Sequence, residues 1–135
     1  MFLVTDAIAM IRDIRAQGQA IGLWGGALNI PQLVGGLVFI THLEGQLVLA
    51  AEVLALAIAG QIHKRTPFSR LTGICHLPWL ALLPWLVYRL QTIDHPAVLR
   101  SWIFYVAITI FLSLIFDARD LYRYARGDRT FAWAK

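Results

Sequence analysis

Four stretches of this chain are almost free of charged residues, and each is long enough to cross a lipid bilayer. A transmembrane helix needs roughly 20 mainly apolar residues, and a helix satisfies its backbone hydrogen bonds within the segment itself. Two of the stretches contain no Asp, Glu, Lys or Arg, and the other two contain one each, Glu52 and Arg100. The sequence therefore predicts an all-α membrane protein with transmembrane helices at about residues 20–41, 45–62, 71–88 and 97–116.

The composition agrees with a single transmembrane domain that takes in residues 1–135. Charged residues make up 15% of the chain, whereas a soluble domain usually has about 25%. The single cysteine, Cys75, excludes an internal disulfide and a cysteine-based metal site. The net charge is +4, but the basic residues lie beside apolar segments. We therefore expect membrane lipids, and not nucleic acid, as the partners of this charge.

The connections and the basic residues predict how the four helices are arranged. The connections are short, which places neighbouring helices side by side as an antiparallel bundle. Ten of the twelve Lys and Arg residues lie on one side of the membrane, and the other two are Arg89 and Arg100. Basic residues accumulate on the cytoplasmic side. We therefore expect an integral protein of a bacterial inner membrane, with both termini cytoplasmic.

The two ends of the chain have patterns typical of the membrane surface. Apolar residues recur at helical spacing near the N-terminus, which predicts an amphipathic interfacial helix over residues 1–18. The pattern predicts that the helix of the fourth span continues into a basic cytoplasmic tail at residues 117–135, with Gly127 as the helix stop. Charged residues near this surface are candidates for binding lipid head groups: Arg65, Asp117, Asp120, Arg123 and Arg126. The alternative is that these residues form salt bridges with one another.

Polar residues within the spans predict a second candidate site. At 1.5 Å per residue, Asn29 lies ~13 Å and Glu52 ~15 Å from the cytoplasmic ends of their spans, and His76 lies ~8 Å deep. Similar depths allow these side chains to meet, and Gln32 lies on the same face as Asn29. Pro31 removes one helix hydrogen bond close by and can free a carbonyl, and because broken helices at membrane depth often line a cavity, we expect a cavity or binding site beside it. We expect a polar cluster of Asn29, Gln32, Glu52 and His76 inside the bundle.

This polar cluster has two interpretations. In the first, Asn29 and Gln32 satisfy a neutral Glu52 and hold the helices in register, because a buried charge without a partner is costly. In the second, Glu52 titrates and binds a proton, a cation or a ligand head group. Ionisable residues inside spans are rare and often functional, so the sequence leaves both interpretations open.

The histidines raise the question of a metal or cofactor. Haem in a membrane bundle commonly takes two histidines from facing helices, so His63 and His76 would be the ligands of a b-type haem. They lie at different depths, and we predict neither a cofactor nor a metal site. Motifs for phosphate loops, paired-carboxylate hydrolases and zinc proteases are absent from the sequence.

Three functions are compatible with these features. The first is a lipid- or partner-binding accessory or scaffold subunit of a membrane assembly, which we expect to be a homo-oligomer or part of a larger complex. The second is an oligomeric small transporter or channel that uses Glu52 as its titrating site. The third is a lipid-modifying or redox enzyme that uses His76. The lack of a catalytic signature favours the first function and leans against an enzyme.

Overall fold

The computed structural model describes residues 2–134, and nearly all of them are helical. The elements in chain order are α1 (Phe2–Ala16), α2 (Gln19–Val38), α3 (Leu43–Arg65), the 3-10 helix η1 (Arg70–His76), α4 (Trp79–Thr92) and α5 (Ala97–Ala125). Three of them, α2, α3 and α5, are long and apolar enough to cross a membrane. The bent pair η1 and α4 makes a fourth if it counts as one span. The prediction of an all-helical chain with several helices suited to crossing a membrane is therefore confirmed.

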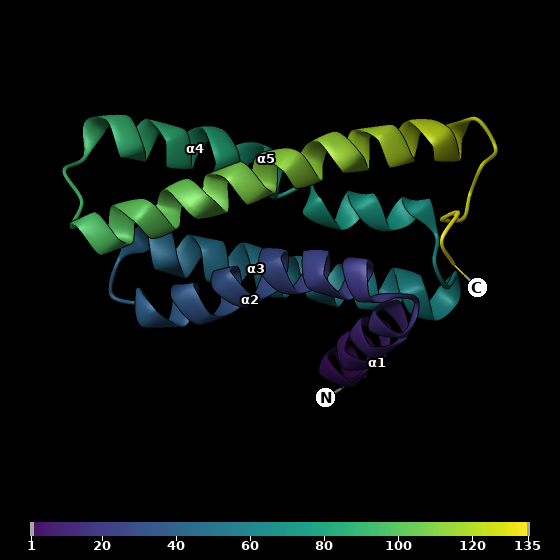
Figure 1. Ribbon diagram of the computed structural model, residues 1–135. Helices are drawn as coiled ribbons and strands as arrows, with labels where there is room; N and C mark the ends of the chain where they lie inside the picture. Colours follow the sequence, from purple (N-terminus) through teal and green to yellow (C-terminus); the bar gives the residue numbers. More distant parts are fainter. Residues whose placement is uncertain (1, 135) are drawn as a thin grey trace.

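The helices run along a common long axis, and α1 crosses one end of them (Figure 1). One end of the molecule, which we call the loop end, holds the connections 39–42 and 93–96. The other, which we call the tail end, holds α1, the connection 66–69 and residues 126–134. Helix α3 packs against α1, α2 and η1, while α5 packs against η1 and α4. Large apolar side chains remain exposed along α2, α3 and α5, as expected for helices in contact with lipid.

The third apolar stretch differs from the single helix expected over residues 71–88. It begins as the 3-10 helix η1, which Ser69 caps by accepting a hydrogen bond from Leu71 N at 3.2 Å. It then bends by 43° into α4. Proline has no backbone N–H, so Pro78 cannot donate to the carbonyl of Ile74, which accepts from Leu77 N at 3.2 Å instead. The proline therefore accounts for the change from 3-10 to α-helical geometry.

Helix α2 continues through Pro31 without a break. Pro31 leaves the carbonyl of Ala27 without its usual helical donor, and the hydroxyl of Tyr105 on α5 donates to that carbonyl at 2.7 Å. Trp102 Nε1, one turn earlier on α5, donates to the Pro31 carbonyl at 2.9 Å. The expectation that Pro31 opens a ligand cavity is not supported, because α5 supplies the missing donor.

The fourth apolar helix continues past the span at 97–116, as the pattern up to Gly127 predicted. Helix α5 extends through Ala125, so the first nine residues of the expected tail belong to it. Gly127 follows with a positive φ of 95°, a conformation that glycine adopts without a steric penalty. Residues beyond it turn back toward η1, where Arg70 N donates to Arg129 O at 2.9 Å and Phe131 N donates to Phe68 O at 3.0 Å.

Candidate functional site

A cavity of about 600 Å³ lies at the tail end of the molecule. Its walls come from the first half of α2, the last half of α5, η1, α1 and residues 131–133. Ligand sites usually have volumes of roughly 300–1,000 Å³, so this cavity is large enough for a small amphiphile or for a lipid head group with part of its chain. We call it the tail-end cavity.

One side of the tail-end cavity is apolar. Helix α2 contributes Ile21, Trp24 and Leu28, and α5 contributes Phe116. The rings of Trp24 and Phe116 meet edge to face, with 5.7 Å between their centroids. Trp24 is 37% exposed and Phe116 is 48% exposed, so this wall continues onto the exposed apolar surface of the helices. An apolar chain in the surrounding layer would therefore meet a matching surface.

The other side of the cavity is charged. Arg70 on η1 is buried, and its guanidinium pairs with Asp120 at 2.5 Å and with Asp128 at 3.4 Å. Arg123 pairs with Asp128 at 2.6 Å. Arg119 also lines the cavity and is exposed, and no side chain within residues 2–134 pairs with its guanidinium. Three arginines and two aspartates line the cavity, and Asp128 pairs with two of these arginines, so Arg119 is the arginine of this wall whose charge has no acidic side-chain partner among residues 2–134.

A histidine–aspartate pair forms part of this charged wall. His76 Nδ1 lies 2.7 Å from Asp117 Oδ2, and the imidazole stacks on Trp79 with 3.9 Å between the ring centroids. Gly73 allows the approach of α5, since a Cβ at that position would lie 3.1 Å from Asp117 Oδ1. These contacts hold the imidazole in one orientation, and none of the described residues bonds its second nitrogen, Nε2. A histidine held in this way can act as a proton acceptor.

The structure divides the predicted polar cluster into two parts. Gln32 and Glu52 are fully buried in the core, while His76 turns to Asp117 in the cavity wall. Asn29 Nδ2 donates to Gly25 O at 2.7 Å, and Gln32 Nε2 donates to Leu28 O at 3.2 Å. Both amides thus bond their own helix, and no hydrogen bond joins the four residues in the part of the chain that the structure describes.

The predicted head-group residues also separate. Asp117, Asp120 and Arg123 line the tail-end cavity, whereas Arg65 and Arg126 do not. Arg126 lies over the ring of Tyr122, on its own helix. Arg70 is a site residue that was not predicted from the sequence, where it was counted only as one of many surface charges. Its position directly after Ser69, at the start of an uncharged segment, was the available signal.

The two histidines considered for haem have other partners. His63 Nε2 lies 3.2 Å from Asp13 Oδ2, and its Nδ1 accepts a hydrogen bond from Phe68 N at 3.4 Å. His76 is bonded to Asp117. Across residues 2–134, no three His, Cys, Asp or Glu side chains are grouped so that they could hold a metal ion.

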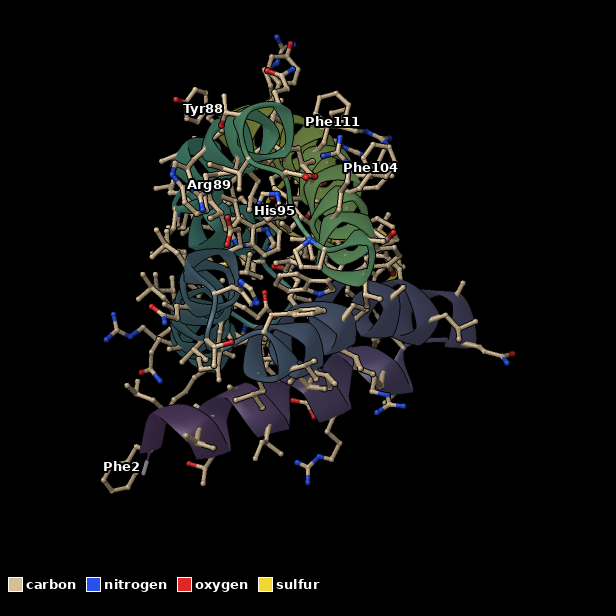
Figure 2. All side chains as sticks on the ribbon, turned by 90° about the vertical axis from the view of Figure 1, so that its left-hand side faces the viewer. Phe2, Tyr88, Arg89, His95, Phe104 and Phe111 are labelled. Carbon is tan, nitrogen blue, oxygen red and sulfur yellow. The ribbon has the colours of Figure 1, made fainter. Side chains whose placement is uncertain are left out.

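A second charged group, which sequence reasoning missed, lies at the loop end. Glu44 is buried, and its Oε1 accepts from Arg89 Nε at 2.7 Å and lies 2.8 Å from His95 Nε2. Figure 2 shows Arg89 and His95 on neighbouring parts of this end of the molecule. All three residues were expected on the same side of the membrane, near helix ends, and their opposite charges could have indicated the pairing.

Neither family models, nor curated proteins, nor solved structures give a match to this chain. The tail-end cavity is therefore defined as a candidate site by its own geometry.

Proposed function

We propose that this chain is a small integral membrane protein that binds an anionic lipid in the tail-end cavity, as an accessory subunit of a membrane assembly. The observation that carries the proposal is the composition of the cavity, in which an apolar wall that reaches the lipid-facing surface meets a wall rich in arginine. An amphiphile with a negatively charged head group has the complementary two-part shape.

The proposed topology places this cavity at the correct level for a lipid head group. We infer an antiparallel bundle of four spans, with η1 and α4 as the third span and the tail end on the cytoplasmic side. The bias of basic residues to the tail end supports this orientation. Anionic lipids give the cytoplasmic leaflet a negative surface potential, so an arginine of the cavity without an acidic partner, Arg119, would attract these lipids in particular.

Arg119 is the residue proposed to select the head group. Arg70 and Arg123 already pair with Asp120 and Asp128, and a ligand bound by either arginine would have to compete with these carboxylates. Arg119 is free of such a partner among the described side chains and lines the cavity. A guanidinium can form two parallel hydrogen bonds to a phosphate or carboxylate. We therefore expect it to bind the anionic group.

Native mass spectrometry of the purified protein would test this proposal. Either phosphatidylglycerol or phosphatidylcholine is added to the protein in detergent, the detergent is removed in the mass spectrometer, and the number of lipid molecules that stay bound is counted. We expect a preference for the anionic lipid that weakens about tenfold or more in Arg119→Ala, because a hydrogen bond to a charged group contributes roughly 1.5–3 kcal/mol. Arg126→Ala is the matched control, since Arg126 is an exposed arginine outside the cavity. Equal losses in both variants would reject the cavity as the binding site.

A second candidate function is lipid modification in the same cavity, and the geometry of the His76–Asp117 pair favours it. The carboxylate orients the imidazole through Nδ1, which would leave Nε2 able to accept a proton from a water molecule or hydroxyl that attacks an ester of the bound lipid. His76→Asn would then abolish turnover of a bound lipid ester while lipid retention stays unchanged. Unaltered lipids after incubation with the wild-type protein would reject this function and leave the binding proposal intact.

A further inference from the structure

Three fully buried side chains in the middle of the molecule have polar atoms without hydrogen-bond partners. They are Gln32 on α2, Glu52 on α3 and Trp79 on α4, and each has an exposed fraction of 0%. The atoms are Gln32 Oε1, both carboxyl oxygens of Glu52 and Trp79 Nε1. Buried polar groups are nearly always hydrogen-bonded, and the absence of a partner is most costly inside a membrane protein. Three such groups from three helices require an explanation.

Gln32 and Glu52 lie at the same level of the molecule. Gly36 on α2 packs against α3 near Leu49, since a Cβ at Gly36 would lie 2.8 Å from Leu49 Cβ. The two helices run in opposite directions from the short connection 39–42. One turn farther from this connection, Gln32 on α2 therefore comes opposite the turn of α3 that holds Glu52.

Trp79 belongs to the same level. It shares a hydrophobic cluster with Leu28 and Val48, which lie one turn from Gln32 and one turn from Glu52 respectively. Cys75, one turn before Trp79, shares a second cluster with Ala55, which lies on the other side of Glu52. Trp79 therefore belongs to the cluster on one side of Glu52, and Cys75, one turn before it, belongs to the cluster on the other side.

The hydrogen-bonding chemistry of these groups is complementary if Glu52 is protonated. Gln32 Oε1 can only accept a hydrogen bond and Trp79 Nε1 can only donate one, while a protonated carboxyl does both. We propose that Glu52, Gln32 and Trp79 form a proton-binding site inside the membrane, in which the Glu52 carboxyl donates toward Gln32 and accepts from Trp79, directly or through one bound water. An ionised Glu52 would leave Gln32 Oε1 without a donor and would place an unpaired charge in the core.

In this proposal, a proton reaches the site from the tail-end cavity. The indole of Trp79 stacks on His76, and His76 lines the cavity and bonds Asp117. Cys75 on η1 is buried next to the site, as a neutral thiol donor or acceptor.

Asp117 on α5 is a charged group near this level, since Cys75 lies within electrostatic reach of both Asp117 and Glu52, and it is bonded to His76. Helix α2 carries no charged side chain. On α3, Glu44 lies about 12 Å away along the axis at 1.5 Å per residue and is paired with Arg89 and His95. The Asp13–His63 pair, which connects α1 to α3, lies about three turns away in the opposite direction.

Infrared spectroscopy of the protein in a detergent without ester groups, at neutral pH, tests the proposal. A protonated carboxyl has a C=O stretching band above the amide I region, and a carboxylate does not. We expect this band in the wild-type protein and its loss in Glu52→Gln, which has almost the same shape. Glu44→Gln is the matched control, and it should keep the band. Identical spectra for wild type and Glu52→Gln would overturn the proposal.

The neighbouring residues provide a test that does not depend on the folding of the Glu52 variant. Trp79→Phe removes the Nε1–H donor, so the C=O band should move to higher frequency. On transfer to heavy water, the band of His76→Phe should exchange more slowly than that of the wild type. A band that does not move in Trp79→Phe would show that Trp79 is not a partner, and unchanged exchange in His76→Phe would show that the proton does not arrive from the cavity.

Discussion

Replacement of Arg70 by alanine should destabilise the tail end more than any other single removal of a charge there. Arg70 is 4% exposed and pairs with Asp120 and Asp128, whose side chains are 20% and 41% exposed. Its guanidinium also lies 5.4 Å from the ring centroid of Phe131. Arg70→Ala would therefore remove two ion pairs and a cation–π contact, and it would leave Asp120 without its cation.

The magnitude follows from the burial of each partner. Breaking a fully buried pair costs roughly 3–5 kcal/mol, and an exposed pair contributes about 0–1 kcal/mol. Asp120 is partly exposed, so we assign its pair about 2 kcal/mol between these limits. The cation–π contact adds about 0.5–1 kcal/mol. The expected loss is therefore about 3 kcal/mol, or a decrease in Tm of about 9 °C for a chain of this length.

Thermal unfolding in detergent, followed by the near-ultraviolet circular dichroism of the tryptophans, would measure this loss. Arg126→Ala is the control, and it should lie within about 0.5 kcal/mol of the wild type as an exposed substitution. Adding Asp120→Asn to Arg70→Ala should recover part of the stability, because it removes the unpaired carboxylate. A Tm for Arg70→Ala that matches the Arg126→Ala control would refute the assignment of Arg70 as the residue that holds the tail end.

Three further predictions concern other parts of the fold. Gly45→Ala should lower stability by about 1–3 kcal/mol in the same melting assay, because the new Cβ would overlap the backbone carbonyl of Phe39. Glu44→Gln should make the connection at the loop end more sensitive to limited proteolysis, since it removes the charge that both an arginine and a histidine contact; unchanged cleavage would argue against a role of the pair in holding that connection. Hydrogen bonds from Gln61 and Lys64, both on α3, hold the pKa of Asp6 below its usual range. A carboxyl whose pKa is lower in the folded state stabilises the fold above its usual pKa of about 3.9, and this stabilisation is lost as the pH falls through the folded-state pKa. Helix α1 should therefore detach from α3 in strong acid, which hydrogen exchange in α1 would measure. An Asp6→Asn variant should show no such pH dependence.

The features that could be predicted from the sequence depend on neighbours along the chain. The uncharged stretches correspond to helices long and apolar enough for a membrane. The amphipathic spacing from Val4 to Ile14 corresponds to α1, and Gly127 follows the end of α5 with a positive φ. Transfer of a helix into lipid depends on the sum of its own side chains and on its backbone hydrogen bonds. Both quantities can be read from one segment at a time.

The partners of the polar side chains could not be read in this way. Depth along the membrane suggested that His76 would meet Glu52. Depth does not specify how a helix is rotated about its axis, and the rotation in the structure directs His76 to Asp117. The carbonyl released by Pro31 was expected to face a cavity. Instead, it accepts a hydrogen bond from the hydroxyl of Tyr105, which is far away in the sequence.

The sequence by itself determined that this chain forms apolar helices suited to a membrane, because hydrophobicity and helix length are properties of each segment. Tertiary structure alone decided where the candidate sites lie. Glycines such as Gly73 let one helix approach another closely enough for a pair of side chains to meet, and the bend before Pro78 leaves space beside η1 for the tail-end cavity. A hydrogen bond needs its two atoms within about 3 Å, and that precision depends on how the helices rotate and pack against one another.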